Sequence, residues 1–144
     1  MTTFLLDANV LIALIDPSHT QHETAHEWFA LQGHAAWATC PLTENAVLRI
    51  LGQARYPNTP GSPGAVLPLL TALCKLPGHV FWPDDISLQE TERIDATRLL
   101  GSAQVTDTYL LALACAHGGQ LASLDRRLVV GAVRGGAQGL HLIA

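Results

Sequence analysis

Short apolar runs recur along the chain, and the intervals between them repeat apolar residues at helical spacing. Strands that are buried on both faces are apolar without interruption, so runs of this length indicate strands. Apolar positions that return with a period of about 3.6 residues indicate one face of a helix. The runs predict strands at residues 3–6, 35–39, 79–82, 120–124 and 140–143, and the periodic intervals predict helices at 8–15, 20–31, 41–54, 65–76, 88–100, 107–117 and 126–133.

Local start and stop signals support several of these helices. Pro41 suits the first position of a helix, where its missing N–H would have no partner. Ser87 and Glu90 have the spacing of a capping box, which predicts a helix start at residue 88. The pair Gly118 and Gly119 ends the helix predicted before it.

The repeated order of strand and helix favours an α/β fold. Parallel strands need crossover connections, and helices in those crossovers cover both faces of the sheet. A chain of 144 residues fits one domain, and the Pro- and Gly-rich stretch at 56–64 is too short and too central for an interdomain linker. We therefore expect residues 1–144 to form a single domain around a parallel sheet.

Charge and hydropathy limit the function classes. Eight Lys and Arg stand against twelve Asp and Glu, a formal net charge of -4, so any contact with nucleic acid must be local. No apolar run reaches the roughly 18 residues of a membrane span, and the first residues lack the positive flank of a secretory signal. These observations predict a cytoplasmic protein without a membrane partner.

The cysteines do not form a recognisable motif. Cys40, Cys74 and Cys115 are odd in number, far apart and without a CxxC pair, which predicts reduced thiols in the core. A nucleophilic role for Cys40 is the alternative, although no histidine stands close to it in the sequence.

Four acidic residues stand beside apolar stretches. Asp7 and Asp125 each follow a predicted strand, and the carboxyl ends of parallel strands meet at one edge of a sheet. Asp107 opens a predicted helix and Glu44 lies in the first turn of another, and helices that return antiparallel to the strands begin at that same edge. Each residue taken alone also fits a helix cap or a helix-dipole partner.

Taken together, the acids predict a metal site. Carboxylates gathered in a partly dehydrated crevice repel one another, and a divalent cation removes that repulsion. Oxygen ligands without paired His or Cys favour Mg²⁺ or Mn²⁺ over Zn²⁺. Such an ion suits hydrolysis of phosphodiesters, because it activates water and offsets the charge that builds on the phosphate.

The chain resembles a PIN-domain ribonuclease of the VapC toxin type. The resemblance rests on four stretches in the order of the family, which are Phe4-Leu5-Leu6-Asp7-Ala8-Asn9-Val10-Leu11-Ile12, Thr43-Glu44, Thr106-Asp107-Thr108-Tyr109-Leu110-Leu111-Ala112-Leu113-Ala114 and Leu121-Ala122-Ser123-Leu124-Asp125-Arg126-Arg127-Leu128. It implies an α/β/α sandwich with a five-stranded parallel sheet. It also implies that Asp7, Glu44, Asp107 and Asp125 hold Mg²⁺ or Mn²⁺ as catalytic residues, with Asn9 and Ser123 as polar support.

The resemblance further implies a toxin that cuts RNA as a homodimer until a small antitoxin blocks its crevice. Residues 42–51 and 65–76 are more apolar than one buried helix stripe requires, which fits a dimer face or a partner groove, or alternatively two well-buried core helices. Arg126 and Arg127 are expected to contact RNA phosphate, or alternatively to lie on a solvated helix. Arg49 and Arg55 are the remaining candidates for RNA contact.

Three other functions remain open at this point. His19, His22 and His26 share one face of a predicted helix beside Glu23, the one place where a transition-metal site has an argument. A haloacid-dehalogenase-like phosphatase would use Asp7 as nucleophile, but it needs a second Asp where this chain has Asn9. A catalytically inactive PIN fold that binds protein or RNA is the third alternative.

Overall fold

A computed structural model describes residues 1–144 and contains one five-stranded sheet. Every neighbouring pair of strands is parallel, and the strand order is β3-β2-β1-β4-β5. This confirms the predicted α/β class and the parallel sheet. The strands are β1 (Phe4–Leu6), β2 (Trp37–Thr39), β3 (His79–Phe81), β4 (Gln120–Ser123) and β5 (Leu140–Leu142).

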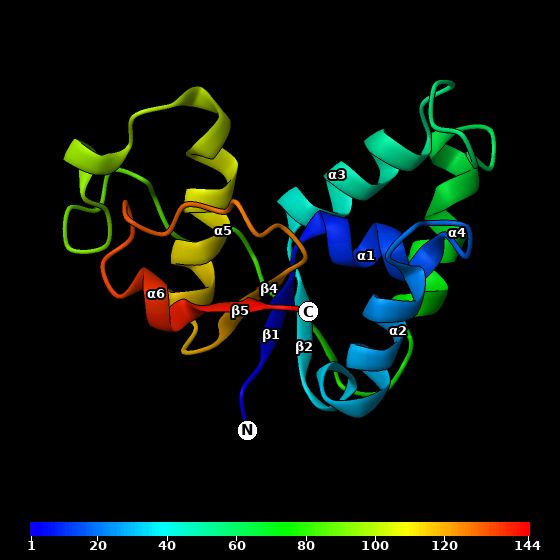
Figure 1. The fold of residues 1–144 in the computed structure, drawn as a ribbon, viewed down its shortest axis with the longest axis horizontal. Helices are drawn as coiled ribbons and strands as arrows, with labels where there is room; N and C mark the ends of the chain where they lie inside the picture. Colours follow the sequence, from blue (N-terminus) through cyan, green and yellow to red (C-terminus); the bar gives the residue numbers. More distant parts are fainter.

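Helices cover both faces of the sheet, as the apolar strands predict. Figure 1 shows the first four helices on one side of the sheet and the last two on the other. Successive residues of the central strand serve opposite cores, because Phe4 and Leu6 pack with the first group of helices and Leu5 packs with the second. The helices are α1 (Ala8–Ile15), α2 (His22–Leu31), α3 (Pro41–Leu51), α4 (Pro63–Cys74), α5 (Val105–Ala116) and α6 (Gly136–Gly139).

The signals at two helix ends act as predicted. Pro41 is the first residue of α3, and Gly118 follows α5 with a φ of 70°, a backbone conformation that glycine adopts without strain.

None of the helices combines the length and the apolar character that a membrane crossing requires.

The predicted helices at 88–100 and 126–133 are wrong. Both segments lack α-helix, and they bond to each other instead through an antiparallel bridge between Ile94 and Val133. The Asp95 N–H donates to the Ala132 carbonyl at 2.8 Å, and similar backbone pairing continues to residue 134. Backbone groups committed to a distant partner are not available for bonds within a helix, so tertiary pairing overrides the local preference.

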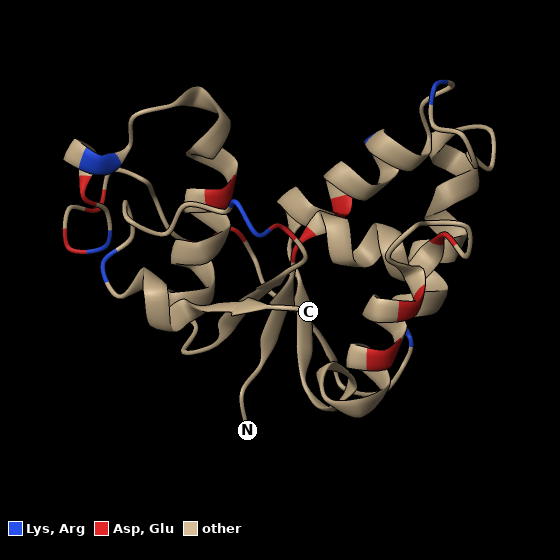
Figure 2. Ribbon diagram, in the orientation of Figure 1, with Lys and Arg blue, Asp and Glu red and all other residues tan.

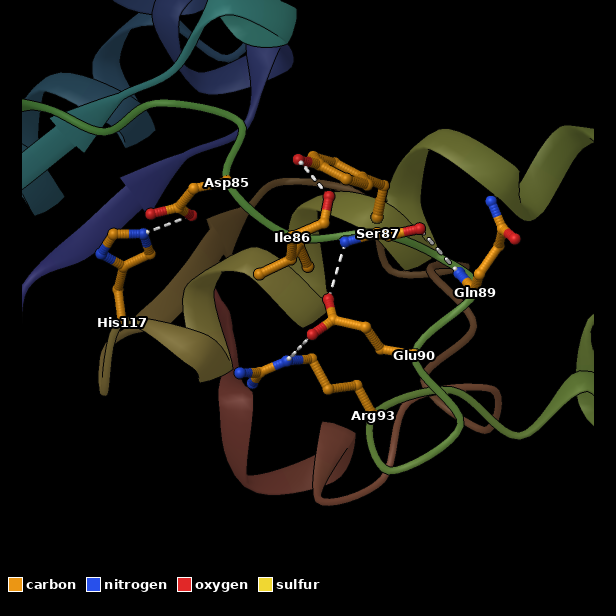
Figure 3. Close-up of polar contacts among 8 residues, drawn as sticks. Asp85, Ile86, Ser87, Gln89, Glu90, Arg93 and His117 are labelled. Carbon is orange, nitrogen blue, oxygen red and sulfur yellow. Dashed lines mark hydrogen bonds and ion pairs between the residues drawn. The ribbon is translucent and has the colours of Figure 1, made fainter.

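The residues of the predicted capping box form a turn that no helix follows. The Glu90 carboxylate accepts the Ser87 N–H at 2.7 Å, as a capping box requires, and also binds Arg93 (Figure 3). The segment just before it is tied to α5, since His117 lies 3.1 Å from Asp85 and Tyr109 donates to the Ile86 carbonyl. These anchors hold the segment against α5 as an extended loop.

The functional interest of the fold lies at the carboxyl ends of the strands. The first residue after β1 and the first residues after β4 lie at this edge, and α5 begins close to it. Figure 2 shows acidic residues on the first turn of α5, at the start of α1 and directly after β4, all at the same end of the sheet.

Candidate active site

Asp7 lies at the junction of β1 and α1, where it caps the helix. Its Oδ1 accepts the Ala8 N–H at 2.8 Å and its Oδ2 accepts the Ser123 hydroxyl at 2.8 Å. The side chain is almost fully buried. Burial raises the pKa of the Asp7 carboxyl, while the bonds from Ser123 and Ala8 act in the opposite direction. Asp7 therefore does cap α1, and its carboxylate is also buried at the end of the central strand.

Ser123 and Asn9 join the ends of β1 and β4. The Asn9 amide donates to the Ser123 hydroxyl oxygen at 3.1 Å, and its carbonyl oxygen accepts the Leu124 N–H at 3.2 Å. Ser123 also accepts the Asp125 N–H at 3.1 Å while donating to Asp7. Because Ser123 contacts both aspartates, it sets their positions relative to each other.

Asp107 and Asp125 line one pocket near this network. The pocket has a volume of about 230 Å³ and is also lined by Arg127. The pKa of Asp107 is raised to about 6, mainly by burial and additionally by the negative charges of Asp7 and Asp125. Asp125 is oriented by the Arg127 N–H, which donates to its Oδ1 at 2.9 Å. The structure therefore brings three of the four predicted acids into one electrostatic neighbourhood.

The aspartates do not form a close set of ligand atoms. In only one set of three His, Cys, Asp or Glu residues do the ligand atoms all lie within 4.8 Å of one another, and that set does not include the aspartates. Mg²⁺ commonly keeps several waters and binds one or two carboxylates directly. The donors present are carboxylate oxygens, which match the preference of Mg²⁺ and Mn²⁺. Burial, and to a smaller extent the charges of Asp7 and Asp125, raises the pKa of Asp107, and a bound cation would favour the ionised carboxylate.

Glu44 bonds to the end of β2. Its Oε2 accepts the Thr39 hydroxyl at 2.7 Å, and its carboxylate belongs to the close set with Cys74 and His79. The carboxylates that raise the pKa of Asp107 are those of Asp7 and Asp125, and Glu44 is not among them. The structure thus places Glu44 in a pocket against α4.

The predicted arginines are exposed, and one of them reaches the site. Arg126 and Arg127 follow Asp125 in a segment that is not helical, so the alternative of a solvated helix is wrong. Arg127 lines the pocket of Asp107 and Asp125. Arg49 on α3 and Arg55 after it are exposed and line none of the pockets.

The predicted histidine site does not form a close ligand set, whereas the cysteine prediction is confirmed in part. His22 bonds to the Ala13 carbonyl at 2.6 Å and His19 accepts the Gln21 N–H, and neither belongs to the close ligand set. All cysteines are free thiols, as predicted, but only Cys40 is fully buried.

Sequence reasoning missed the convergence of Thr39, Cys74 and His79 around Glu44. These residues come from β2, the end of α4 and the start of β3, and no spacing motif connects them. The one signal in the sequence is the alternation of side chains along β2. It places Thr39 on the same face of the sheet as Trp37, which packs with α1 to α4.

Comparisons with known proteins agree with the fold. The sequence model of the family described as PIN domain matches residues 4–132. Ribonuclease VapC44 of Mycobacterium tuberculosis is 41% identical over 131 residues, which cover 91% of this chain and 92% of the relative. Ribonuclease VapC39 of the same organism is 38% identical over 133 residues, 92% of this chain and 96% of the relative.

A solved structure shares the fold at low sequence identity. The crystal structure of Mycobacterium tuberculosis VapC20, described as a sarcin-ricin loop cleaving toxin, superposes with a TM-score of 0.60 at 13% identity and covers 84% of this chain and 87% of that one. With a family match over nearly the whole length and relatives at this identity, the chain belongs to the PIN domain family.

Proposed function

We propose that the protein is a metal-dependent endoribonuclease and the toxin of a type II toxin–antitoxin system, with residues 1–144 as a single nuclease domain. The observation that carries this proposal is the gathering of Asp7, Asp107 and Asp125 at the carboxyl end of a PIN sheet, with the pKa of Asp107 raised to about 6. The similarity to ribonuclease VapC44 over nine-tenths of both chains supports RNA as the substrate.

The three aspartates are the ligands that we propose for Mg²⁺ or Mn²⁺. The bound ion would supply an activated water and offset negative charge on the phosphate that is attacked. Ser123 donates to Asp7 and accepts from the Asp125 backbone, so it holds both carboxylates in position. Glu44 is the fourth ligand that the family resemblance implies, and because only its Oε2 accepts the Thr39 hydroxyl, its second oxygen remains for an ion.

Asn9 and the arginines complete the proposed site. Asn9 bonds to Ser123 and to the backbone of Leu124, which keeps the serine hydroxyl directed at Asp7. Arg127 lines the pocket beside the aspartates, and its guanidinium suits a backbone phosphate of RNA, with Arg126 next to it on the surface. In a chain with net negative charge, such local contacts replace a general cationic surface.

RNA cleavage by the purified protein tests this proposal. We expect cleavage with Mg²⁺ or Mn²⁺, none with chelator, and a loss of at least about a hundredfold in Asp7→Asn and Asp107→Asn, because each removes a charged ligand. Glu27→Gln is the matched control, since Glu27 is an exposed carboxylate on α2. Unchanged cleavage in both Asn variants contradicts the nuclease site, and no cleavage by the wild type favours a binding module.

A homodimer and an antitoxin are the partners that we propose. Helix α4 is not a fully buried core helix, because its Leu67 and Leu69 are 49% and 44% exposed, and Leu76 just after it is 45% exposed. An apolar groove of about 310 Å³ runs between α1 and α4 and includes Leu69 and Leu76. Exposed apolar surface of this kind marks contact sites. A cytoplasmic location follows from the proposed RNA substrate and antitoxin.

Two measurements test the partners. Light scattering is expected to give the mass of a dimer for the wild type and of a monomer for Leu69→Glu, because a buried charge without a partner opposes association. Growth arrest on expression, relieved by the protein product of an adjacent reading frame, tests the antitoxin. A dimeric Leu69→Glu variant excludes α4 as the dimer face.

A further inference from the structure

The Glu44 carboxylate is held through one of its two oxygens. Glu44 lies in the first turn of α3, is half-buried and lines the pocket against α4. Its Oε2 accepts the hydroxyl of Thr39, the last residue of β2, at 2.7 Å. Both oxygens of a carboxylate accept, so this bond leaves Oε1 for another partner. A long side chain such as glutamate has many rotamers in solution, and a bond from a fixed donor restricts them.

Thr39 is a fixed donor because it belongs to an interior strand of the sheet. Its side chain is fully buried, and its carbonyl accepts the Trp82 N–H at 2.9 Å. Strand β2 pairs with β1, and Asp7 follows β1 directly. The Thr39 hydroxyl therefore ties Glu44 to the same strands that carry Asp7.

His79 determines the direction of the Thr39 proton. Its Nε2 lies 2.8 Å from the Thr39 hydroxyl oxygen. The hydroxyl has one proton and donates it to Glu44, so its oxygen accepts from His79 and Nε2 carries the donated proton. The imidazole packs against the buried ring of Trp37, with ring centroids 4.6 Å apart, which restricts its rotation. A donor fixed in this position keeps the Thr39 proton directed at Glu44.

We propose that Thr39 and His79 are positioning residues of the nuclease site. His79 donates to Thr39, Thr39 donates to Glu44 Oε2, and Glu44 is thereby oriented to offer Oε1 to the ion. This inference rests on the proposed function and adds two residues that act on the ion only through Glu44. Residues that orient a metal ligand commonly change metal affinity by about 10- to 100-fold when they are removed. A ligand that is ordered before the ion arrives loses less freedom on binding.

Titration of the metal-free protein with Mn²⁺, in the absence of RNA, tests the role of Thr39. Free Mn²⁺ gives a strong electron paramagnetic resonance signal that decreases on binding, so the titration yields a dissociation constant. Thr39→Val keeps the shape and removes the hydroxyl, and we expect it to weaken Mn²⁺ binding by about 10- to 100-fold. Thr39→Ser keeps the hydroxyl and is expected to bind as tightly as the wild type. Thr71→Val is the matched control, because Thr71 is exposed and lines the same pocket.

Two substitutions test the donor at His79. His79→Phe keeps a ring against Trp37 and removes the N–H, and we expect it to weaken Mn²⁺ binding by about tenfold. His79→Gln keeps an N–H donor and is expected to restore most of the affinity. Nitrogen-15 chemical shifts of the imidazole report which nitrogen carries the proton. In the wild type we expect it on Nε2.

The kinetics of RNA cleavage separate positioning from a purely structural role. We expect Thr39→Val to lower kcat at limiting Mg²⁺, to leave the KM for RNA unchanged and to recover when Mg²⁺ is raised, because the hydroxyl acts through a metal ligand. Damage to the fold would not be repaired by metal. Glu44→Gln removes the charge of the ligand itself and is not expected to recover.

The outcomes separate this inference from the proposed function. Wild-type affinity for Mn²⁺ in Thr39→Val, equal weakening in Thr71→Val, or a His79 proton on Nδ1 overturns the inference and leaves the nuclease proposal standing. A wild type that neither binds Mn²⁺ nor cleaves RNA overturns the proposed function and the inference with it. Circular dichroism confirms that each variant is folded, and the two His79 variants decide the question if Thr39→Val is not.

Discussion

Asp107 is expected to lower the stability of the metal-free protein at neutral pH. Its pKa is raised from 3.8 to about 6, so the folded state binds its proton more tightly than the unfolded state does. The folded state therefore loses relative stability as the pH rises from about 4 to about 6, where the carboxylate must ionise next to Asp7 and Asp125. Asp107→Asn removes this penalty, and we expect the variant to be more stable than the wild type above pH 6.

The size of the effect follows from the pKa and from solvent exposure. A change from 3.8 to about 6 corresponds to about 3 kcal/mol at full strength. Asp107 is only half-buried, so solvent screening reduces the expected gain to about 1 kcal/mol. For a chain of this length that gain raises Tm by roughly 3 °C.

Urea unfolding in chelator from pH 3.5 to pH 8 measures this difference. We expect wild type and Asp107→Asn to be equally stable near pH 3.5, where both side chains are uncharged, and to separate as the pH rises. Mg²⁺ is expected to stabilise the wild type more than the variant, because a ligand that binds the folded state raises its stability. An Asn variant that is less stable at pH 7.5, or a difference that does not change with pH, refutes the reasoning.

Three further substitutions probe the site and the core. Ser123→Ala is expected to lower the free energy of unfolding in urea by about 1–3 kcal/mol and to reduce RNA cleavage, because it removes the hydroxyl that orients two aspartates. The control Ser102→Ala, at an exposed serine, is expected to change neither quantity. Thr108→Val is expected to leave the free energy of unfolding unchanged or to raise it by up to about 1 kcal/mol in thermal unfolding, since the buried Thr108 hydroxyl has no hydrogen-bond partner. A loss of more than about 1 kcal/mol contradicts this prediction. Leu70→Ala is expected to lower the free energy of unfolding by about 2–4 kcal/mol, because Leu70 is 4% exposed. Leu69→Ala is expected to lower it by under about 1 kcal/mol in the monomer, because Leu69 is 44% exposed, and equal effects of the two variants would contradict this core assignment.

Much of the fold could be predicted from the sequence, because strands that are buried in the sheet are composed mainly of apolar residues. The strands at the centre of the sheet are covered on both faces, so β1 is apolar throughout, β2 is apolar except for Thr39, and both stand out as short runs. Caps act over a few residues, and Pro41 and Gly118 marked helix ends for that reason. The positions of Asp7 and Asp125 after strands β1 and β4 followed from the parallel topology in the same way.

The segments at 88–100 and 126–133 could not be predicted from local sequence. Their helical periodicity and capping signal are genuine, and Glu90 even forms the expected bond to Ser87. What decides their conformation is the pairing of Ile94 with Val133, which joins stretches far apart in the chain. Local propensity is worth a fraction of a kcal/mol per residue, so a few long-range backbone bonds and side-chain anchors override it.

The sequence by itself determined the layers of this protein and the residue types at the end of its sheet, because hydrophobic periodicity and strand ends are local properties. Only the tertiary structure decided which acids interact. It brought Asp107 within electrostatic reach of Asp7 and Asp125, and it paired one oxygen of Glu44 with Thr39. It also brought Cys74 and His79 to Glu44, because the contact depends on where α4 ends and on the register of β3 against β2. Distances between side chains on different elements are set by packing, and no spacing in the chain records them.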